Sequence, residues 1–427
     1  MKRRLIVVFV ALLALLASCA KPASAPVGFE FMHTYVEEDR LKVIQGLIDA
    51  FQAENPGFEV KQVPVSEDAF WTRITTLMQG RQLPALIDVS VDQARLLAAS
   101  DVVDVDTCTS VVQDVGVDRF YAGAVAVLRG DSGKLFGVPL TGWVQGIWYR
   151  KDLFAEKGLA APEKWDDILT AAKAFHSPAD KKYGIVFATE ATDFTEQTFS
   201  QFALSNGAEL FDASGKPAFN SPAMRRAVEF YRELYKYSLP GSNGFTQVKD
   251  SFSGGNAAMV VYSTYILGGL YEQGMADKVG FAVPEGVAPA SFGMVSTEVI
   301  TNTVPEAQRQ AAAAFMKFLL RNENYIPWMH MAPGGPNPVL KGVASDPAYL
   351  GHPLLKAYGD TAKAIPEAFA DLAMFGFQDG KTNPKMGEIS ARMIIPTALN
   401  NILVLGADLD GELAKAQKAM EDVVAGR

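Results

Sequence analysis

Metal-binding side chains are scarce in this chain of 427 residues, which has four histidines and two cysteines. The histidines are scattered, and neither cysteine lies at a spacing from a histidine or from the other cysteine that a zinc site requires. We therefore expect no metal site and no cofactor. The residues concerned are His33, His176, His330, His352, Cys19 and Cys108.

Catalytic and nucleotide-binding motifs are also missing. Residues 130–133 match the nucleophile segment of chymotrypsin-like proteases, but no histidine base or orienting acid can be assigned to them, so a polar turn is expected. Lys134 follows a glycine, as in a Walker-type phosphate loop, but position 128 holds Leu128 where that loop requires glycine. We predict that the chain is not an enzyme and that a separate subunit handles ATP.

Positive charge is in the minority, since the formal net charge is −9, and no long run of lysine and arginine occurs. An acidic chain of this kind is a poor partner for nucleic acid and for anionic lipid. We expect no nucleic-acid partner, and any membrane attachment must come from something other than charge.

The sequence lacks an apolar run of the roughly 20 residues that span a bilayer. Three cationic residues precede an apolar run at 5–16, a pattern that predicts an export signal over residues 1–18. The small residues before Cys19 resemble the bacterial lipoprotein signal, in which the cysteine thiol carries a lipid. This resemblance implies a lipidated tether over 19–27 and an extracytoplasmic, membrane-anchored protein on the periplasmic face or cell surface.

Lipid attachment at Cys19 leaves Cys108 without a partner for a disulfide inside the chain. We therefore expect Cys108 to be a small buried or half-buried residue. Stability must come from core burial, and 427 residues are ample for two domains or one large one.

The apolar periodicity predicts alternating strands and helices. Strands are expected at 29–34, 58–65 and 86–91, with amphipathic helices at 41–51 and 70–78 between them, which indicates a parallel α/β sheet. A strand at 147–149 and a helix at 165–175 begin a second unit. Further helices are expected at 223–235, 305–321 and through most of 366–424, and further strands at 257–262 and 295–301.

Several phrases, taken in order, resemble landmarks of the family 1 extracellular solute-binding proteins, which include the sugar-binding components of ABC importers such as maltose-binding protein. They are residues 47–57 ending in Asn55-Pro56-Gly57, residues 133–139 from Gly133 to Pro139, residues 149–154, residues 252–259, and Gly334-Gly335-Pro336 after the helix at 305–321. The sequence departs from the family at Ala85 and Leu86, where Asp-Val is usual, and at Arg150, where Asn is usual.

The resemblance implies a two-lobed periplasmic-binding-protein fold, each lobe a mainly parallel sheet flanked by helices, with a hinge of several chain crossings. We place the N-terminal lobe at 28–140 plus 292–325 and the C-terminal lobe at 141–291 plus 326–427. The implied function is that of a monomeric receptor that captures a sugar, mono- or oligosaccharide, between closing lobes. It would deliver the sugar to the transmembrane subunits of an ABC permease with a separate ATPase subunit.

Candidate ligand-binding residues are those near the expected crossings and strand ends. Aromatic rings stack on the C–H faces of sugars, and carboxylates and amides bond to hydroxyls. The candidates are Trp143, Tyr265, Tyr262 and Trp71 for stacking, Asp92, Glu37, Glu38 and Gln197 for polar contacts, and Met294 at a second crossing, with Glu196, His33 and Tyr35 beside them. The alternatives are packing within the hinge for Trp143, core packing for the other aromatic residues, and plain solvation for the acids.

Two other classes of function stay open at this point. The alternative within transport is a receptor for a charged solute: a polyamine needs several inward-facing acids, and a glycerol phosphate needs arginine or backbone donors at helix starts. The alternative outside transport is a surface lipoprotein whose lobes bind another protein.

Overall fold

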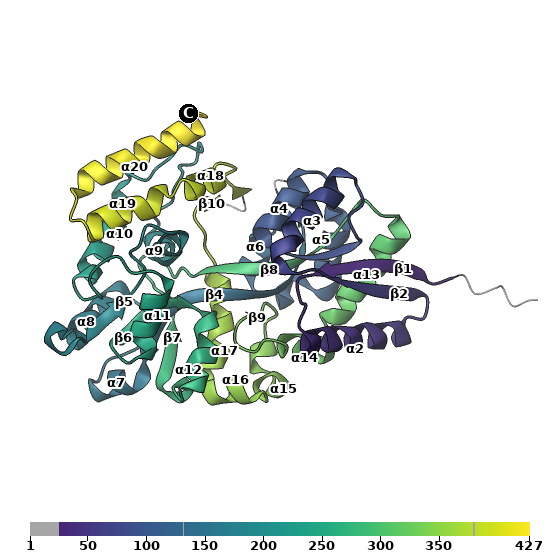
Figure 1. Ribbon diagram of the computed structural model, residues 1–427, viewed down its shortest axis with the longest axis horizontal. Helices are drawn as coiled ribbons and strands as arrows, with labels where there is room; N and C mark the ends of the chain where they lie inside the picture. Colours follow the sequence, from purple (N-terminus) through teal and green to yellow (C-terminus); the bar gives the residue numbers. More distant parts are fainter. Residues whose placement is uncertain (1–24, 131, 379–380) are drawn as a thin grey trace, which may run out of the picture.

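The computed structural model describes residues 25–130, 132–378 and 381–427 (Figure 1). The predicted signal peptide, Cys19 and most of the predicted tether therefore lie outside the described residues. Among the helices of these described ranges, none combines the length and the apolar character that a membrane span requires.

The first lobe begins with three parallel strands that alternate with helices. The strands are β1 (Val27–His33), β2 (Phe58–Pro64) and β3 (Leu86–Ser90), and the helices are α2 (Glu38–Glu54), α3 (Glu67–Gln79) and α4 (Val91–Ala99). β1 lies between β2 and β3 and runs parallel to both. The apolar residues Ile44, Ile48 and Phe51 recur at helical spacing in α2 and are buried, so the periodicity argument is confirmed here.

Helices cover both faces of these strands. In Figure 1, α3 and α4 lie on one side of β1 and β2, together with α5 (Val105–Val115) and α6 (Ala122–Ala126), and α2 lies on the other side. Cys108 is fully buried in α5. Both findings agree with the sequence, which predicted an α/β lobe and a buried or half-buried thiol.

Two long strands connect the lobes and change the sheet from parallel to mixed. β4 (Val138–Arg150) carries the chain into the second lobe, and β8 (Phe292–Ile300) carries it back (Figure 1). They run antiparallel to each other, and β8 is also antiparallel to β3. The prediction of mainly parallel sheets is therefore accurate for β1–β3 but not for the crossings, because an outgoing and a returning strand that pair must point in opposite directions.

The sequence also placed the start of β4 nine residues too late, at Ile147 and not at Val138. Proline and glycine interrupt the expected alternation, and the register shifts between Pro139 and Thr141. Gly142 allows close pairing, since a Cβ at this position would lie 2.6 Å from the carbonyl oxygen of Met294. What looked like a connecting segment is thus a bulged strand.

The second lobe completes the nine-stranded sheet, whose main order is β2-β1-β3-β8-β4-β6-β5. Its strands are β5 (Tyr183–Val186), β6 (Ala257–Ser263) and β7 (Val279–Ala282), and both β6 and β7 pair antiparallel with β4. Its helices are α7 (Lys151–Glu156), α8 (Trp165–Phe175), α9 (Asp193–Ser205), α10 (Pro222–Tyr235), α11 (Phe245–Ser253) and α12 (Leu267–Glu272).

The last third of the chain returns to the first lobe and then to the second. It contains α13 (Glu306–Leu319), α14 (Asn322–Met329), β9 (Asn337–Pro338), α15 (Pro347–Leu350), α16 (Pro353–Tyr358), α17 (Asp360–Glu367), the hairpin strands β10 (Phe377–Gln378) and β11 (Lys381–Thr382), α18 (Met386–Ala391), α19 (Ile394–Leu403) and α20 (Leu409–Val424). The C-terminal tail is mainly helical, as predicted.

α14 continues across residue 325, where the sequence placed a lobe boundary. Its Trp328 packs against Phe31 and Tyr35 of the first lobe, with ring centroids 6.2 and 5.6 Å apart. The contacts thus tie α14 to the first lobe, whereas the division of the chain into lobes at numbered residues stays a prediction.

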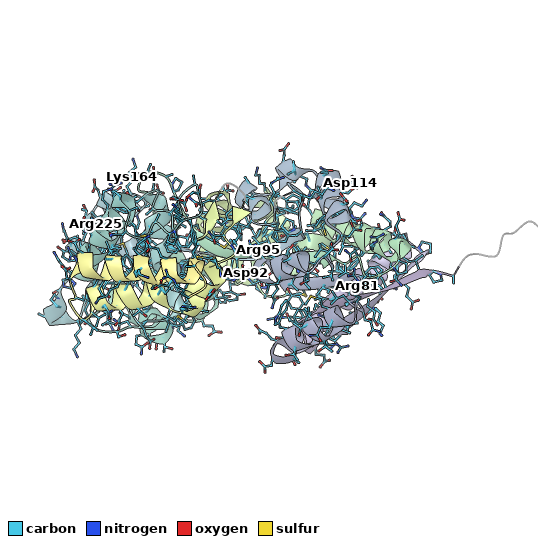
Figure 2. All side chains as sticks on the ribbon, turned by 90° about the horizontal axis from the view of Figure 1, so that it is seen from above. Arg81, Asp92, Arg95, Asp114, Lys164 and Arg225 are labelled. Carbon is cyan, nitrogen blue, oxygen red and sulfur yellow. The ribbon has the colours of Figure 1, made fainter. Side chains whose placement is uncertain are left out.

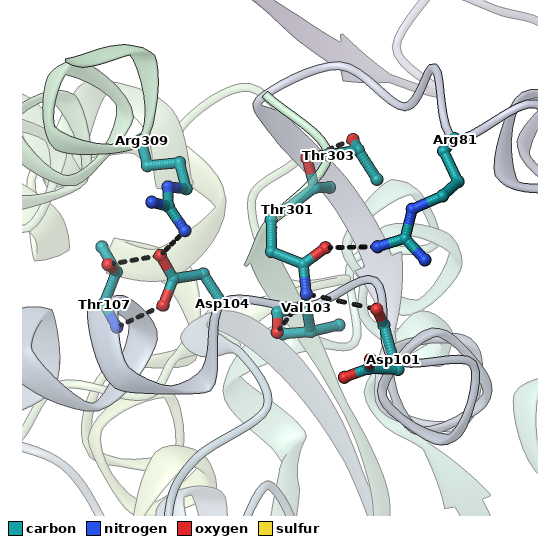
Figure 3. Close-up of polar contacts among 9 residues, drawn as sticks. Arg81, Asp101, Val103, Asp104, Thr107, Thr301, Thr303 and Arg309 are labelled. Carbon is teal, nitrogen blue, oxygen red and sulfur yellow. Dashed lines mark hydrogen bonds and ion pairs between the residues drawn. The ribbon is translucent and has the colours of Figure 1, made fainter. Parts of the chain in front are cut away.

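Side-chain hydrogen bonds fix the chain where β8 leaves the sheet (Figure 3). Asn302 donates to the carbonyl oxygens of Asp101 and Val103. Asp104 accepts from the backbone and side chain of Thr107 and forms an ion pair with Arg309 at 3.0 Å. The start of α5 and the start of α13 are therefore joined by one carboxylate.

Candidate functional site

The candidate site lies on the crossing strands, where Trp143 of β4 is paired with Met294 of β8. Phe292, two residues before Met294, presents its ring on the same side, with its centroid 5.8 Å from that of Trp143. All three side chains are half-buried. The strand register therefore produces an apolar, partly open surface at the junction of the lobes.

Tyr265 extends this surface from the second lobe. It lies in the 3₁₀ turn Thr264–Ile266 that follows β6, and its ring meets Trp143 edge to face with centroids 6.3 Å apart. Thr264 donates a hydrogen bond of 2.8 Å to the carbonyl oxygen of Gly335, and a Cβ at Gly335 would lie 3.0 Å from the Tyr265 ring. The glycine-containing loop thus supports Tyr265 while leaving 59% of it exposed.

The first lobe contributes a tyrosine and an arginine. Tyr35 follows β1, and the guanidinium of Arg40 lies 5.9 Å from its ring centroid and 3.6 Å from a Glu37 carboxylate oxygen. Partial burial raises the pKa of Tyr265, the charge of Arg40 acts against this rise, and the charge of Glu67 adds to it. Residues of both lobes are therefore within electrostatic reach of one another. We call Tyr35, Arg40, Trp143, Tyr265, Phe292 and Met294 the interlobe site.

Two buried carboxyls lie beside the interlobe site. Asp88 of β3 and Glu298 of β8 are register partners. Burial raises the pKa of Asp88 to about 7, although a hydrogen bond from Tyr35 lowers it. Burial and the neighbouring Asp88 raise the pKa of Glu298 well above its ordinary value. The first-lobe wall behind Tyr35 therefore carries less negative charge than its two acids suggest.

Of the other predicted residues, Tyr262 is buried, so its ring does not contribute an exposed face to the interlobe site. Its ring packs against Phe194 of α9 at 5.5 Å and Phe245 of α11 at 5.0 Å. Phe245 is 53% exposed. The sequence reasoning did not select these two phenylalanines, although Phe194 lies only three residues before the selected Gln197.

The polar candidates are spread over several elements. Glu37 is the only one that contacts a residue of the interlobe site directly, through Arg40. Glu38 is largely exposed and pairs with Lys42, and Asp92 pairs with Arg95 at 3.1 Å, near the middle of the molecule in Figure 2. The side chain of Gln197 is half-buried in α9, where its backbone carbonyl accepts from Ser200.

Trp71 is half-buried and packs against the core of the first lobe, which is the alternative that the sequence left open for it. The sequence reasoning did not select Arg40 and Phe292, and it ranked Tyr35 second. The available signal was weak: Phe292 stands two residues before Met294, and Arg40 is three residues after Glu37 on α2. Only the strand register and the helix orientation bring them to the site.

Two cavities on the described surface lie elsewhere. One, of about 390 Å³, is lined by Gly28, Glu59, Lys61, Pro84 and Gln308 among others, at the ends of β1 and β3 away from β4. The other, of about 560 Å³, lies among α18, α19 and α20. Neither includes a predicted ligand-binding residue. Among the described residues, no group of three or more His, Cys, Asp and Glu side chains could hold a metal ion.

Comparison with known proteins identifies the protein family to which a chain with this site belongs. The family described as bacterial extracellular solute-binding protein matches residues 36–326. A relative from Escherichia coli K12, named "Putative ABC transporter periplasmic-binding protein YcjN", is 37% identical over 412 residues, with 96% of each chain covered. The "Mannitol-binding protein" of Pseudomonas aeruginosa PAO1 is 27% identical over 286 residues, with 64% of each chain covered.

Among solved structures, the cyclic alpha-maltosyl-1,6-maltose binding protein from Arthrobacter globiformis aligns with a TM-score of 0.76 at 20% identity. The alignment covers 94% of this chain and 100% of that one. At this level of identity the likeness concerns the fold alone, which is the two-lobed architecture that the sequence predicted.

Proposed function

Because this chain belongs to the bacterial extracellular solute-binding proteins and is a solute-binding receptor of an ABC transporter, we propose that its solute is a sugar. The family consists of transporter binding proteins and not of enzymes, in agreement with the absence of catalytic motifs in the sequence. The proposal concerns the class of solute, a mono- or oligosaccharide, and the residues that hold it.

The aromatic pair Trp143 and Tyr265 carries the proposal. The two rings lie 6.3 Å apart, edge to face, and come from the crossing strand β4 and from the turn after β6. Sugars present C–H faces that pack on such rings, and an exposed ring beside a half-buried one offers a stacking platform. Tyr265 is 59% exposed, which is unusual for a large aromatic residue and suits a ligand contact.

The charges around the pair favour a neutral solute over a strongly charged one. Arg40 already pairs with Glu37, so its guanidinium is partly neutralised before any ligand arrives. A phosphate ester needs unneutralised arginine or backbone donors, and a polyamine needs several ionised acids. Asp88 and Glu298, the nearest acids behind Tyr35, are the ones with raised pKa values.

The names of two similar proteins also support a neutral, sugar-like solute. One is named for mannitol and the other for a cyclic maltose derivative. Both are neutral polyhydroxylated molecules, which need hydroxyl-bonding side chains together with apolar faces. Glu37, Glu38, Asp92 and Gln197 remain our candidates for the hydroxyl contacts, with Trp71 and Tyr262 as further aromatic candidates.

We propose closure of the two lobes about β4 and β8 as the mechanism of capture. Closing on a solute would bury the interlobe site, and the closed form would then dock on the permease subunits as a monomer. Export by a signal peptide at 1–18 and lipid attachment at Cys19 belong to the same proposal. Mass spectrometry of the mature protein tests the lipid attachment. The natural chain should carry added acyl mass, and Cys19→Ala should lack it.

A ligand screen by thermal shift tests the class of solute, since a ligand that binds only the folded state raises the melting temperature. The panel should contain mono- and oligosaccharides, sugar alcohols, glycerol phosphates and polyamines. A shift with sugars alone supports the proposal. A shift with only polyamines or phosphates overturns the solute class and keeps the receptor, and no shift at all favours a protein ligand.

A further inference from the structure

The feature that the proposed function leaves unused is the pair of acids Asp88 and Glu298. They face each other across the antiparallel strands β3 and β8, where directly opposite side chains have Cβ atoms roughly 5 Å apart. Asp88 is 7% exposed and Glu298 is 0% exposed. Two negative charges in such positions repel each other and are poorly solvated, so this arrangement is unfavourable when both acids are ionised.

No positive charge compensates the pair. In the described part of the chain, neither carboxyl takes part in an ion pair within 4 Å, and both oxygens of Glu298 lack a hydrogen-bond partner. His33, on the neighbouring strand β1, is also buried. Burial lowers its pKa to about 4, so it is neutral at neutral pH and supplies no counter-charge.

The polar group that interacts with the pair from the end of β1 is the hydroxyl of Tyr35. Tyr35 donates a hydrogen bond to Asp88, and its own pKa is raised by burial and by both acids. Tyr265 also raises the pKa of Tyr35, but more weakly than the two acids do. From β4, the residue opposite Glu298 is Val138, which carries no charge. Asp88 therefore has a donor as an anion, whereas Glu298 has none.

We propose that the pair of Asp88 and Glu298 keeps one proton at neutral pH, so that only one of the two acids is ionised, and that it acts as a pH-sensitive latch between the crossing strand β8 and the first lobe. The proton resides on Glu298, and Asp88 remains the acceptor of the Tyr35 hydroxyl. Release of this proton to solvent at alkaline pH leaves two carboxylates opposite each other, and their repulsion loosens the pairing of β8 with β3.

The sign of the stability change follows from proton counting. Unfolded carboxyls titrate near pH 4, whereas the pair in the native state keeps a proton to higher pH. The native state therefore binds more protons than the unfolded state from about pH 4 upward, and the free energy of unfolding falls as the pH rises through this window. Each extra native proton changes the unfolding constant by up to about tenfold per pH unit.

Urea unfolding of the purified protein from pH 5 to pH 9 tests the latch. The double variant Asp88→Asn with Glu298→Gln should show a smaller rise of the unfolding constant with pH than the natural chain, by up to about tenfold per pH unit. Glu59→Gln, an exposed acid on β2, is the matched control and should leave the slope unchanged. Glu196, whose pKa burial raises to about 7, contributes the same background slope to every variant.

Amide hydrogen exchange in β8 provides a second measurement that does not depend on global unfolding. After correction for the intrinsic effect of pH, exchange in Thr297–Ile300 should accelerate above neutral pH in the natural chain and not in Glu298→Gln. Equal pH slopes in the natural chain and the double variant would overturn the proposal. Equal pH dependence of β8 exchange in the natural chain and in Glu298→Gln would also overturn it. This second comparison applies even if the double variant does not fold.

Discussion

At the scale of the single residue, Trp143 illustrates what a sequence can and cannot indicate. Its position between Gly142 and Gln145 in a predicted crossing selected it, and Tyr265 was selected through the resemblance to a family. That their rings meet at 6.3 Å, with the Phe292 ring 5.8 Å from that of Trp143, depends on strand register. Register between strands distant in sequence is not encoded in local periodicity, so Phe292 and Arg40 were missed.

Replacing Trp143 by alanine should weaken sugar binding about tenfold to hundredfold, because it removes the stacking face at the centre of the site. Isothermal titration with the sugar found in the ligand screen measures this change. Trp143→Phe should recover part of the affinity, since a ring is restored.

The matched control for this prediction is Tyr271→Ala. Tyr271 is a partly exposed aromatic residue of α12 outside the interlobe site, and its removal should leave the affinity unchanged. Full-strength binding by Trp143→Ala, with the fold intact by circular dichroism, would count against stacking at Trp143.

At the scale of helices and strands, periodicity located most of the elements. α2, α3, α8, α10 and α13 lie within a few residues of their predicted positions because each buries a regular apolar face. β4 was shortened because Pro139, Gly142 and Gly146 break the alternation of an extended segment. Its direction relative to β8 is a property of the return path, which no local pattern contains.

We expect the carboxylate of Asp104 to contribute measurably to stability, because it caps the start of α5. Asp104→Ala removes the N-cap of α5 and the ion pair with Arg309, and should lower the free energy of unfolding by about 1–3 kcal/mol. Asp104→Asn keeps a capping oxygen and should cost less. Urea denaturation curves distinguish the two variants.

The prediction for Asp104 has an internal check. If Asp104→Ala and Asp104→Asn destabilise equally, the hydrogen bonds to Thr107 contribute little and the ion pair with Arg309 accounts for the effect. Arg309 lies in the first turn of α13. Such a result would mean that Asp104 stabilises the fold mainly by joining α5 to α13 and not by capping α5.

At the scale of the whole molecule, the family, the two-lobed fold and the receptor function were all accessible from the sequence. They follow from the ordered sequence phrases that resemble the family, and these phrases can be identified without knowing which residues are in contact. The mixed sheet, the path of α14 and the Asp88 and Glu298 pair were not accessible. Each of these depends on which distant segments become neighbours, and the chain brings β8 beside β3 only after some two hundred intervening residues.

Lobe closure should appear as a decrease in the radius of gyration when the sugar is added. Small-angle scattering with and without saturating sugar measures it, and Trp143→Ala at the same sugar concentration is the control. An unchanged profile in the natural chain, together with proven binding, would contradict closure and leave a rigid receptor.

The continuity of the sheet across both lobes has a mechanical consequence. β8 pairs with β3 over residues 296–300 and with β4 over residues 292–298, so that residues 296–298 are bonded on both sides, and β4 is bonded in turn to β6 and β7. Rotation of one lobe against the other must therefore twist a hydrogen-bonded ribbon and not bend a loose linker. In the closure proposed above, the twisted ribbon would store elastic energy, and release of the solute would let the lobes return to their first arrangement without a separate source of work.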